Sequence, residues 1–136
     1  MKWIFVLFFT LGFFGFLSMP VLANSGEVSG TVTMSKELEK NLTPMGALFI
    51  IARKAGVNAA GAPPLAALKI PQPKFPQHFV IGAQNSMMGG KFEGPLTISA
   101  RYSATGDALD KSGPQATAPK SVQPGKVDLK IELKKL

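Results

Sequence analysis

The segment Pro95–Ser103 reads PLTISARYS, and apolar and polar side chains alternate along it. Because successive side chains of a strand point to opposite faces, this alternation predicts a strand with one buried face. The same pattern recurs in Glu27–Met34 and, most regularly, in Val127–Lys134. The side chains that these segments direct inward are Val28, Val32, Met34, Leu96, Ile98, Ala100, Tyr102, Val127, Leu129, Ile131 and Leu133.

The segments between these strands predict the remaining elements. Ala47–Ala52 (ALFIIA) is apolar on both faces and rich in β-branched residues, which is typical of a central strand. Leu65–Ile70 and His78–Ile81 predict two shorter strands. Ser35 predicts the start of a short helix that runs through Leu42, because a serine oxygen accepts from the first amides of a helix. Residues 108–125 are polar and rich in proline, and we expect them to be irregular.

Glycine and proline interrupt the whole chain at short intervals. The 136 residues include 14 glycines and 11 prolines, a frequency that argues against long helices. Turns spaced every 8–12 residues are typical of a β-sandwich. We therefore expect an all-β sandwich of about seven strands, with one short helix after the first strand.

The amino-terminal residues have the pattern of an export signal. Lys2 precedes Trp3–Leu17 (WIFVLFFTLGFFGFL), which is nearly all apolar and has the length of a signal-peptide core. Pro20 ends that stretch, and Val21-Leu22-Ala23 supplies small or branched residues before a cleavage site. We expect residues 1–23 to be a signal peptide cleaved after Ala23, and residues 24–136 to form one periplasmic domain. Contact with a membrane is expected only if that signal stays uncleaved.

Composition excludes several kinds of chemistry. The absence of cysteine removes disulfides, thiolate metal sites and a Cys nucleophile. No serine lies in a nucleophile-elbow pattern, and the carboxylates are scattered, so we expect no enzymatic activity and no cofactor. The net charge of +7 comes from lysines spread singly, without the interleaved aromatic residues of a nucleic-acid surface. A protein or peptide is therefore the expected partner, and nucleic acid is not.

Two features predict a binding surface. One is a loop that carries Ser86, Met87 and Met88 with Phe92 nearby, because methionine adapts to varied partners. The other is a sheet edge that accepts an extended peptide. Two alternatives stay open: a copper site formed by His78 with Met87 or Met88, since imidazole and thioether suit copper, and a structural accessory subunit whose basic face docks to an acidic partner.

Five motifs occur in an order that resembles a known family. They are GTVTMSKEL at 30–38, ALFIIAR at 47–53, PPLAALK at 63–69, FVIGAQNSMM at 79–88 and ISARYSATGDA at 98–108. Together they are similar to the C-terminal immunoglobulin-like periplasmic domain of cytochrome c-type biogenesis proteins of the CcmI/CycH type. In the loop, Gln84-Asn85 stand where the family pattern has acids before the serine.

This resemblance implies an immunoglobulin-like β-sandwich with a non-enzymatic role. Larger proteins of the family hold apocytochrome c for delivery to haem ligation, so the implied partner is apocytochrome c or the maturation machinery. Of the family's loop residues, Ser86 and Met87 match this sequence and are the first candidates for partner contact.

Overall fold

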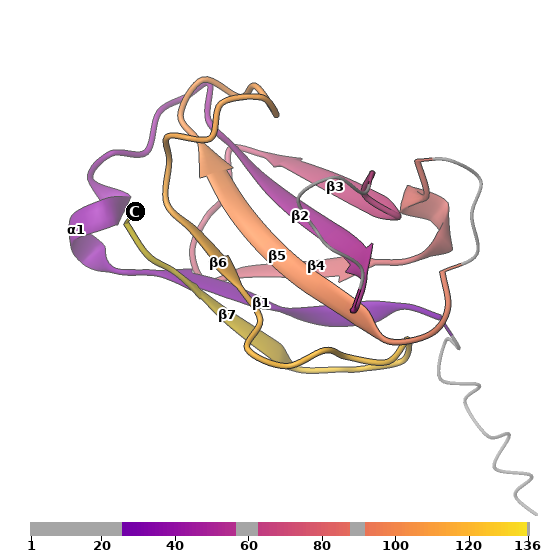
Figure 1. Cartoon of the computed structure of the whole chain (residues 1–136). Coiled ribbons are helices and arrows are strands. Elements are labelled where there is room, and N and C mark those ends of the chain that lie inside the picture. Colours follow the sequence, from indigo (N-terminus) through magenta and orange to yellow (C-terminus); the bar gives the residue numbers. More distant parts are fainter. Residues whose placement is uncertain (1–25, 57–62, 88–91, 136) are drawn as a thin grey trace, which may run out of the picture.

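The computed structural model describes residues 26–56, 63–87 and 92–135 (Figure 1). The expected signal peptide and Met88 lie outside these residues. The elements, in chain order, are β1 (Val28–Met34), α1 (Lys36–Glu39), β2 (Ala47–Lys54), β3 (Ala66–Pro71), β4 (Gln77–Ile81), the 3-10 turn η1 (Ala83–Asn85), β5 (Leu96–Ser103), β6 (Gln115–Thr117) and β7 (Leu129–Leu133).

The strands form two sheets. One has the order β4-β1-β7 and the other the order β3-β2-β5-β6. All pairings are antiparallel except β1 with β7, which run parallel with Gly30 opposite Leu129. This arrangement confirms the predicted immunoglobulin-like β-sandwich, with the expected short helix after the first strand.

The core lies between the two sheets. Each long strand contributes every second side chain, so the alternation in the sequence corresponds to burial in the structure. The largest fully buried apolar side chains are Leu48, Ile50, Ile81, Leu96, Ile98, Leu133, Val28 and Val32.

Helix α1 begins as expected and ends earlier than expected. The side-chain oxygen of Ser35 accepts a hydrogen bond of 3.4 Å from the backbone N–H of Leu38. The helix ends at Glu39, whereas the sequence predicted that it would run through Leu42. Leu42 packs against the core from beyond the helix end.

Two sequence predictions near the carboxyl end are wrong. A strand, β6, lies at Gln115–Thr117, inside the stretch that was expected to be irregular. Val127 was expected to point inward, and its side chain is 61% exposed. The reason is Asp128, whose φ of 56° lies in the left-handed region. The extended backbone therefore begins only at Leu129, and Val127 does not share the alternation of β7.

Candidate functional site

Strand β7 has one edge that is almost unpaired. It pairs with β1 along one side, and on the other side it meets β6 only through a bridge between Gln115 and Lys134. The two backbone hydrogen bonds of this bridge measure 3.0 and 3.2 Å. Within the described residues no further strand pairs with this edge, so β6 and β7 diverge from the bridge onward. We call the resulting groove the β7 seam; its sides are β7 and residues 115–126.

The backbone groups of β7 that face the seam can be assigned. The N–H and C=O of Lys134 both point to Gln115. Because alternate residues of a strand direct their backbone groups to the same edge, those of Glu132 and Lys130 also point into the seam. These groups offer the main-chain donors and acceptors that an added strand requires.

The segment that crosses from β6 to β7 is fastened at two points. Val122 exchanges hydrogen bonds of 2.7 and 2.8 Å with Leu96 of β5. Farther on, the N–H of Gly125 donates to the carbonyl of Glu27 at 2.7 Å, and the carbonyl of Lys126 accepts from Ser29 at 2.9 Å. This wall of the seam is therefore held to both sheets and keeps the groove open.

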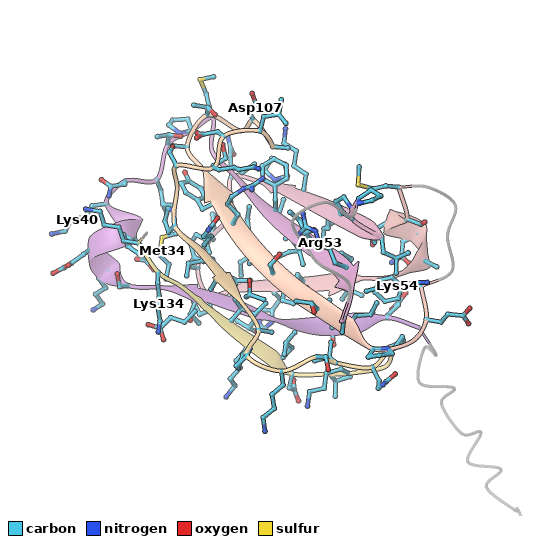
Figure 2. All side chains as sticks on the ribbon, viewed as in Figure 1. Met34, Lys40, Arg53, Lys54, Asp107 and Lys134 are labelled. Carbon is cyan, nitrogen blue, oxygen red and sulfur yellow. The ribbon has the colours of Figure 1, made fainter. Side chains whose placement is uncertain are left out.

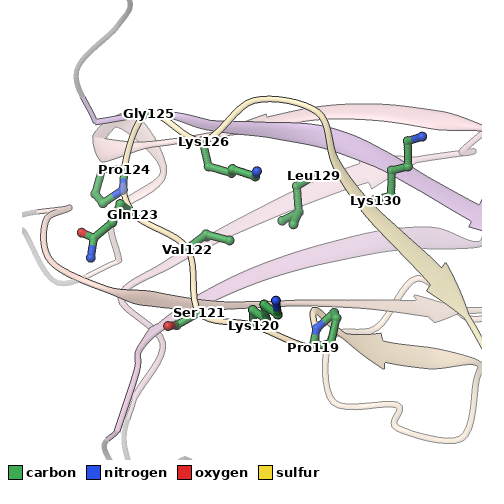
Figure 3. Close-up of a pocket in the computed structure, with 10 residues that line it drawn as sticks. All are labelled: Pro119, Lys120, Ser121, Val122, Gln123, Pro124, Gly125, Lys126, Leu129 and Lys130. Carbon is green, nitrogen blue, oxygen red and sulfur yellow. The ribbon is translucent and has the colours of Figure 1, made fainter.

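A hollow of about 560 Å³ lies at the crossover end of the seam (Figure 3). Its apolar floor is formed by Val122 and Leu129, which point toward one another in Figure 3. Lys120, Lys126 and Lys130 surround this floor. The hollow continues into a second one of about 410 Å³ between β6 and β7, which shares Pro119 and Lys130 with the first.

The seam carries more positive than negative charge. Lys120, Lys126, Lys130 and Lys134 line it, and Glu132 is the acidic side chain among the lining residues. An apolar floor with a basic rim suits an amphipathic segment with acidic groups.

The structure separates the residues of the predicted loop. Ser86 forms a bridge with Ala66, and the N–H of Met87 donates a 3.2 Å hydrogen bond to the carbonyl of Leu65. The Met87 side chain is 59% exposed and available to a partner, whereas Phe92 is only 6% exposed and belongs to the core. The expectation that Phe92 lies on the loop surface is therefore wrong; Met88 lies outside the described residues.

His78 lies on the exposed face of β4, in the three-stranded sheet. Its Nδ1 atom is 3.0 Å from the hydroxyl oxygen of Thr31 on β1. Met87 instead lies beside the start of β3, in the opposite sheet. The structure thus places His78 and Met87 on different layers of the sandwich, and Met88 lies outside the described residues. The described residues also contain no cluster of three or more His, Asp or Glu side chains that could hold a metal.

The sequence predicted a sheet edge that accepts a peptide but did not predict which edge or which residues, because a groove depends on which strand edges remain unpaired. The available signal was the spacing of Lys120, Val122, Lys126 and Leu129 in a stretch that also contains Pro119 and Pro124. That stretch lay across the boundary between a segment expected to be irregular and a predicted strand.

Comparison with known proteins identifies one family. The family model for the cytochrome c-type biogenesis protein H Ig-like domain matches residues 28–134, which is most of the chain. No curated protein and no solved structure matches. Within residues 26–56, 63–87 and 92–135, no helix has the length and apolar character needed to cross a membrane. The chain therefore belongs to the family of cytochrome c-type biogenesis protein H Ig-like domains, and this membership supports an accessory role in cytochrome c maturation.

Proposed function

We propose that this protein is an exported, non-enzymatic binding protein that holds an extended segment of apocytochrome c at the β7 seam. The observation that carries the proposal is the unpaired edge of β7 beside an apolar floor. The family match supports the link to cytochrome c maturation and to the periplasm. The apolar stretch Trp3–Leu17 supports export.

Binding at the seam would proceed by strand addition. Backbone groups of the segment pair with those of Lys130 and Glu132, which gives affinity without regard to sequence. An apolar side chain of the segment enters the hollow over Val122 and Leu129, which gives selectivity. A partner that is not yet folded suits this mode, because its backbone is still free to pair.

The loop at Ser86 and Met87 is a second candidate surface. Met87 is exposed at the end of η1 and lies on the predicted family motif. Its contribution can be separated from that of the seam, because Met87 is attached beside β3. One binding experiment therefore tests both surfaces.

The experiment measures binding of fluorescent peptides that tile an apocytochrome c sequence to the purified protein. Glu132→Pro removes a backbone N–H that faces the seam and leaves the donors toward β1 in place. We expect it to weaken binding at least tenfold, and Glu132→Ala, which keeps the N–H, to change binding less than twofold. Thermal melting of both variants checks that the sandwich persists.

The loop is tested with Met87→Ser, and the matched control is Met45→Ser, another exposed methionine at a distant turn. Loss of binding in Met87→Ser with full binding in Glu132→Pro would move the site from the seam to the loop. Absence of binding to every peptide would overturn apocytochrome c as the partner.

A further inference from the structure

The outer face of the four-stranded sheet carries an unusual set of side chains. Leu48, Ile50 and Ala52 of β2 belong to the core, so the alternating residues Phe49, Ile51 and Arg53 face outward. Phe49 lies opposite Lys69 of β3 and opposite Arg101 of β5. It is only 7% exposed, and the Lys69 ammonium lies 5.9 Å from the centre of its ring.

Both arginines of the sequence lie on this face. Arg53 pairs with Thr97 of β5, and Arg101 lies four positions farther along the same strand. Figure 2 shows Arg53 on β2. The two side chains line a trough of about 190 Å³ together with Ile51, Ser99, Gln115 and Thr117.

The guanidinium groups in this trough are incompletely bonded. The Nε atoms of Arg53 and Arg101 are buried and have no hydrogen-bond partner in the protein. Buried donors are nearly always paired, and an unpaired donor on a charged group is especially unfavourable. One terminal nitrogen of Arg101 donates to the carbonyl of Ala108, which holds the side chain in place and leaves its Nε–H free.

No acidic side chain of the described sheet face neutralises these cations. The outward positions of β3, β2, β5 and β6 include Lys69, Arg53 and Arg101 and no Asp or Glu. The acids of the adjacent turn are engaged locally: Asp107 accepts from the N–H of Leu109 at 2.9 Å, and Asp110 accepts from Ser112 at 2.6 Å. The face therefore lacks negative charge where it holds oriented donors.

We infer that the Arg53–Arg101 trough is a carboxylate-binding site that receives the acidic side chains of an extended segment of a partner protein. A carboxylate fits the fork formed by Nε–H and a neighbouring terminal N–H of one guanidinium, which is the geometry that lysine cannot offer. Two such forks in one trough select a segment with more than one carboxylate. This inference does not rest on the proposed function. β6 borders both sites, but the trough is formed with β2 and β5, whereas the β7 seam is formed with β7.

The first test observes the donors directly. Because the sequence has two arginines, the nitrogen–proton NMR spectrum of the ¹⁵N-labelled protein holds two arginine Nε–H signals. Titration with the peptide Ac-Ser-Glu-Ser-Glu-Ser-NH₂ is expected to shift both signals, and the matching Gln peptide is expected to shift neither. Unmoved Nε–H signals at saturating acidic peptide would overturn the inference.

The second test separates a bidentate site from general attraction to a basic protein. Arg53→Lys and Arg101→Lys keep the charge and remove the fork, and each is expected to weaken binding of the acidic peptide at least fivefold. Lys54→Gln removes one charge at the adjacent position on the other side of β2, and it is expected to change binding less than twofold. Equal binding by Arg→Lys variants and wild type, or equal shifts with acetate at the same carboxylate concentration, would contradict recognition of a peptide by paired guanidinium forks.

Discussion

The backbone N–H of Thr43 donates a 2.9 Å hydrogen bond to the phenolic oxygen of Tyr102, 59 positions later in the chain. Tyr102 is the last inward residue of β5's alternation, and its ring also meets Phe75 edge-on at a centroid distance of 6.5 Å. Gly46 passes so close that an added Cβ would lie 1.9 Å from the phenolic oxygen. One side chain thus fastens the connection between α1 and β2 to the end of the sandwich.

Replacing Tyr102 by Phe should lower the free energy of unfolding by about 1 kcal/mol, because the ring packing is kept and one hydrogen bond to a buried hydroxyl is lost. Urea denaturation measures the difference. Tyr102→Ala should cost several times more, about 3–5 kcal/mol, since it also empties the space beside Phe75. A Phe variant as stable as the wild type would show that the Thr43 contact does not stabilise the fold.

Gly30→Ala should destabilise the protein by about 1–3 kcal/mol, the range for overpacking a close contact. A Cβ at Gly30 would lie 2.2 Å from the carbonyl oxygen of Leu129, where β1 and β7 run in parallel. Because the obstacle is backbone, β7 must move, and we expect binding at the β7 seam to fall as well. Ser29→Ala, at the preceding position of β1, is the control. It should leave both the stability and the binding at the β7 seam unchanged.

Much of the fold could be predicted because β1, β5 and β7 alternate buried and more exposed side chains, while β2 is buried on both faces along most of its length. The alternation in Pro95–Ser103 and Glu27–Met34 locates β5 and β1 to within one residue. Strand β6 escaped prediction because three residues, QAT, are too short to show a period. Val127 was misplaced because a periodic pattern cannot reveal that Asp128 adopts a positive φ.

The two proposed surfaces were harder to predict, because both depend on which strands lie side by side in the fold. The β7 seam exists because β6 leaves β7 after one bridge, and no local sequence pattern encodes an unpaired edge. Arg53 and Arg101 are 48 positions apart in sequence and line the same trough only because β2 pairs with β5 in this register. Of the two described hydrophobic residues predicted to contact a partner at the loop, Met87 lies on the surface, whereas Phe92 is buried.

Asp110 should make the stability of the turn after β5 depend on pH. Hydrogen bonds from Ser112, and then from Thr105 and Ser103, lower the pKa of its carboxyl below 3.8. A carboxyl whose pKa is lower in the folded state stabilises that state above the unfolded pKa. This stabilisation is lost as the pH falls through the folded pKa. We expect Asp110→Asn to be less stable than wild type near neutral pH, with the difference vanishing well below pH 3.8.

The cause of that shift can be tested at Ser112, whose hydroxyl donates to Asp110 at 2.6 Å. Ser112→Ala removes this donor and keeps the backbone N–H bond of 3.1 Å. NMR titration of the Asp110 carboxyl should then show its pKa move up toward the ordinary value. A pKa that is unchanged in Ser112→Ala would assign the shift to other groups.

Truncation of Phe92 should lower the free energy of unfolding far more than truncation of Met87, although both residues belong to the same stretch of sequence. Phe92 is buried among the core residues, so Phe92→Ala should cost about 3–5 kcal/mol of unfolding free energy. Met87 is exposed, and Met87→Ala should change stability by no more than about 0.5 kcal/mol. Urea denaturation of the two variants beside wild type measures both values. A small cost at Phe92 would mean that its ring leaves the core in solution. Phe92 would then be available for partner contact near the loop, as the sequence predicted.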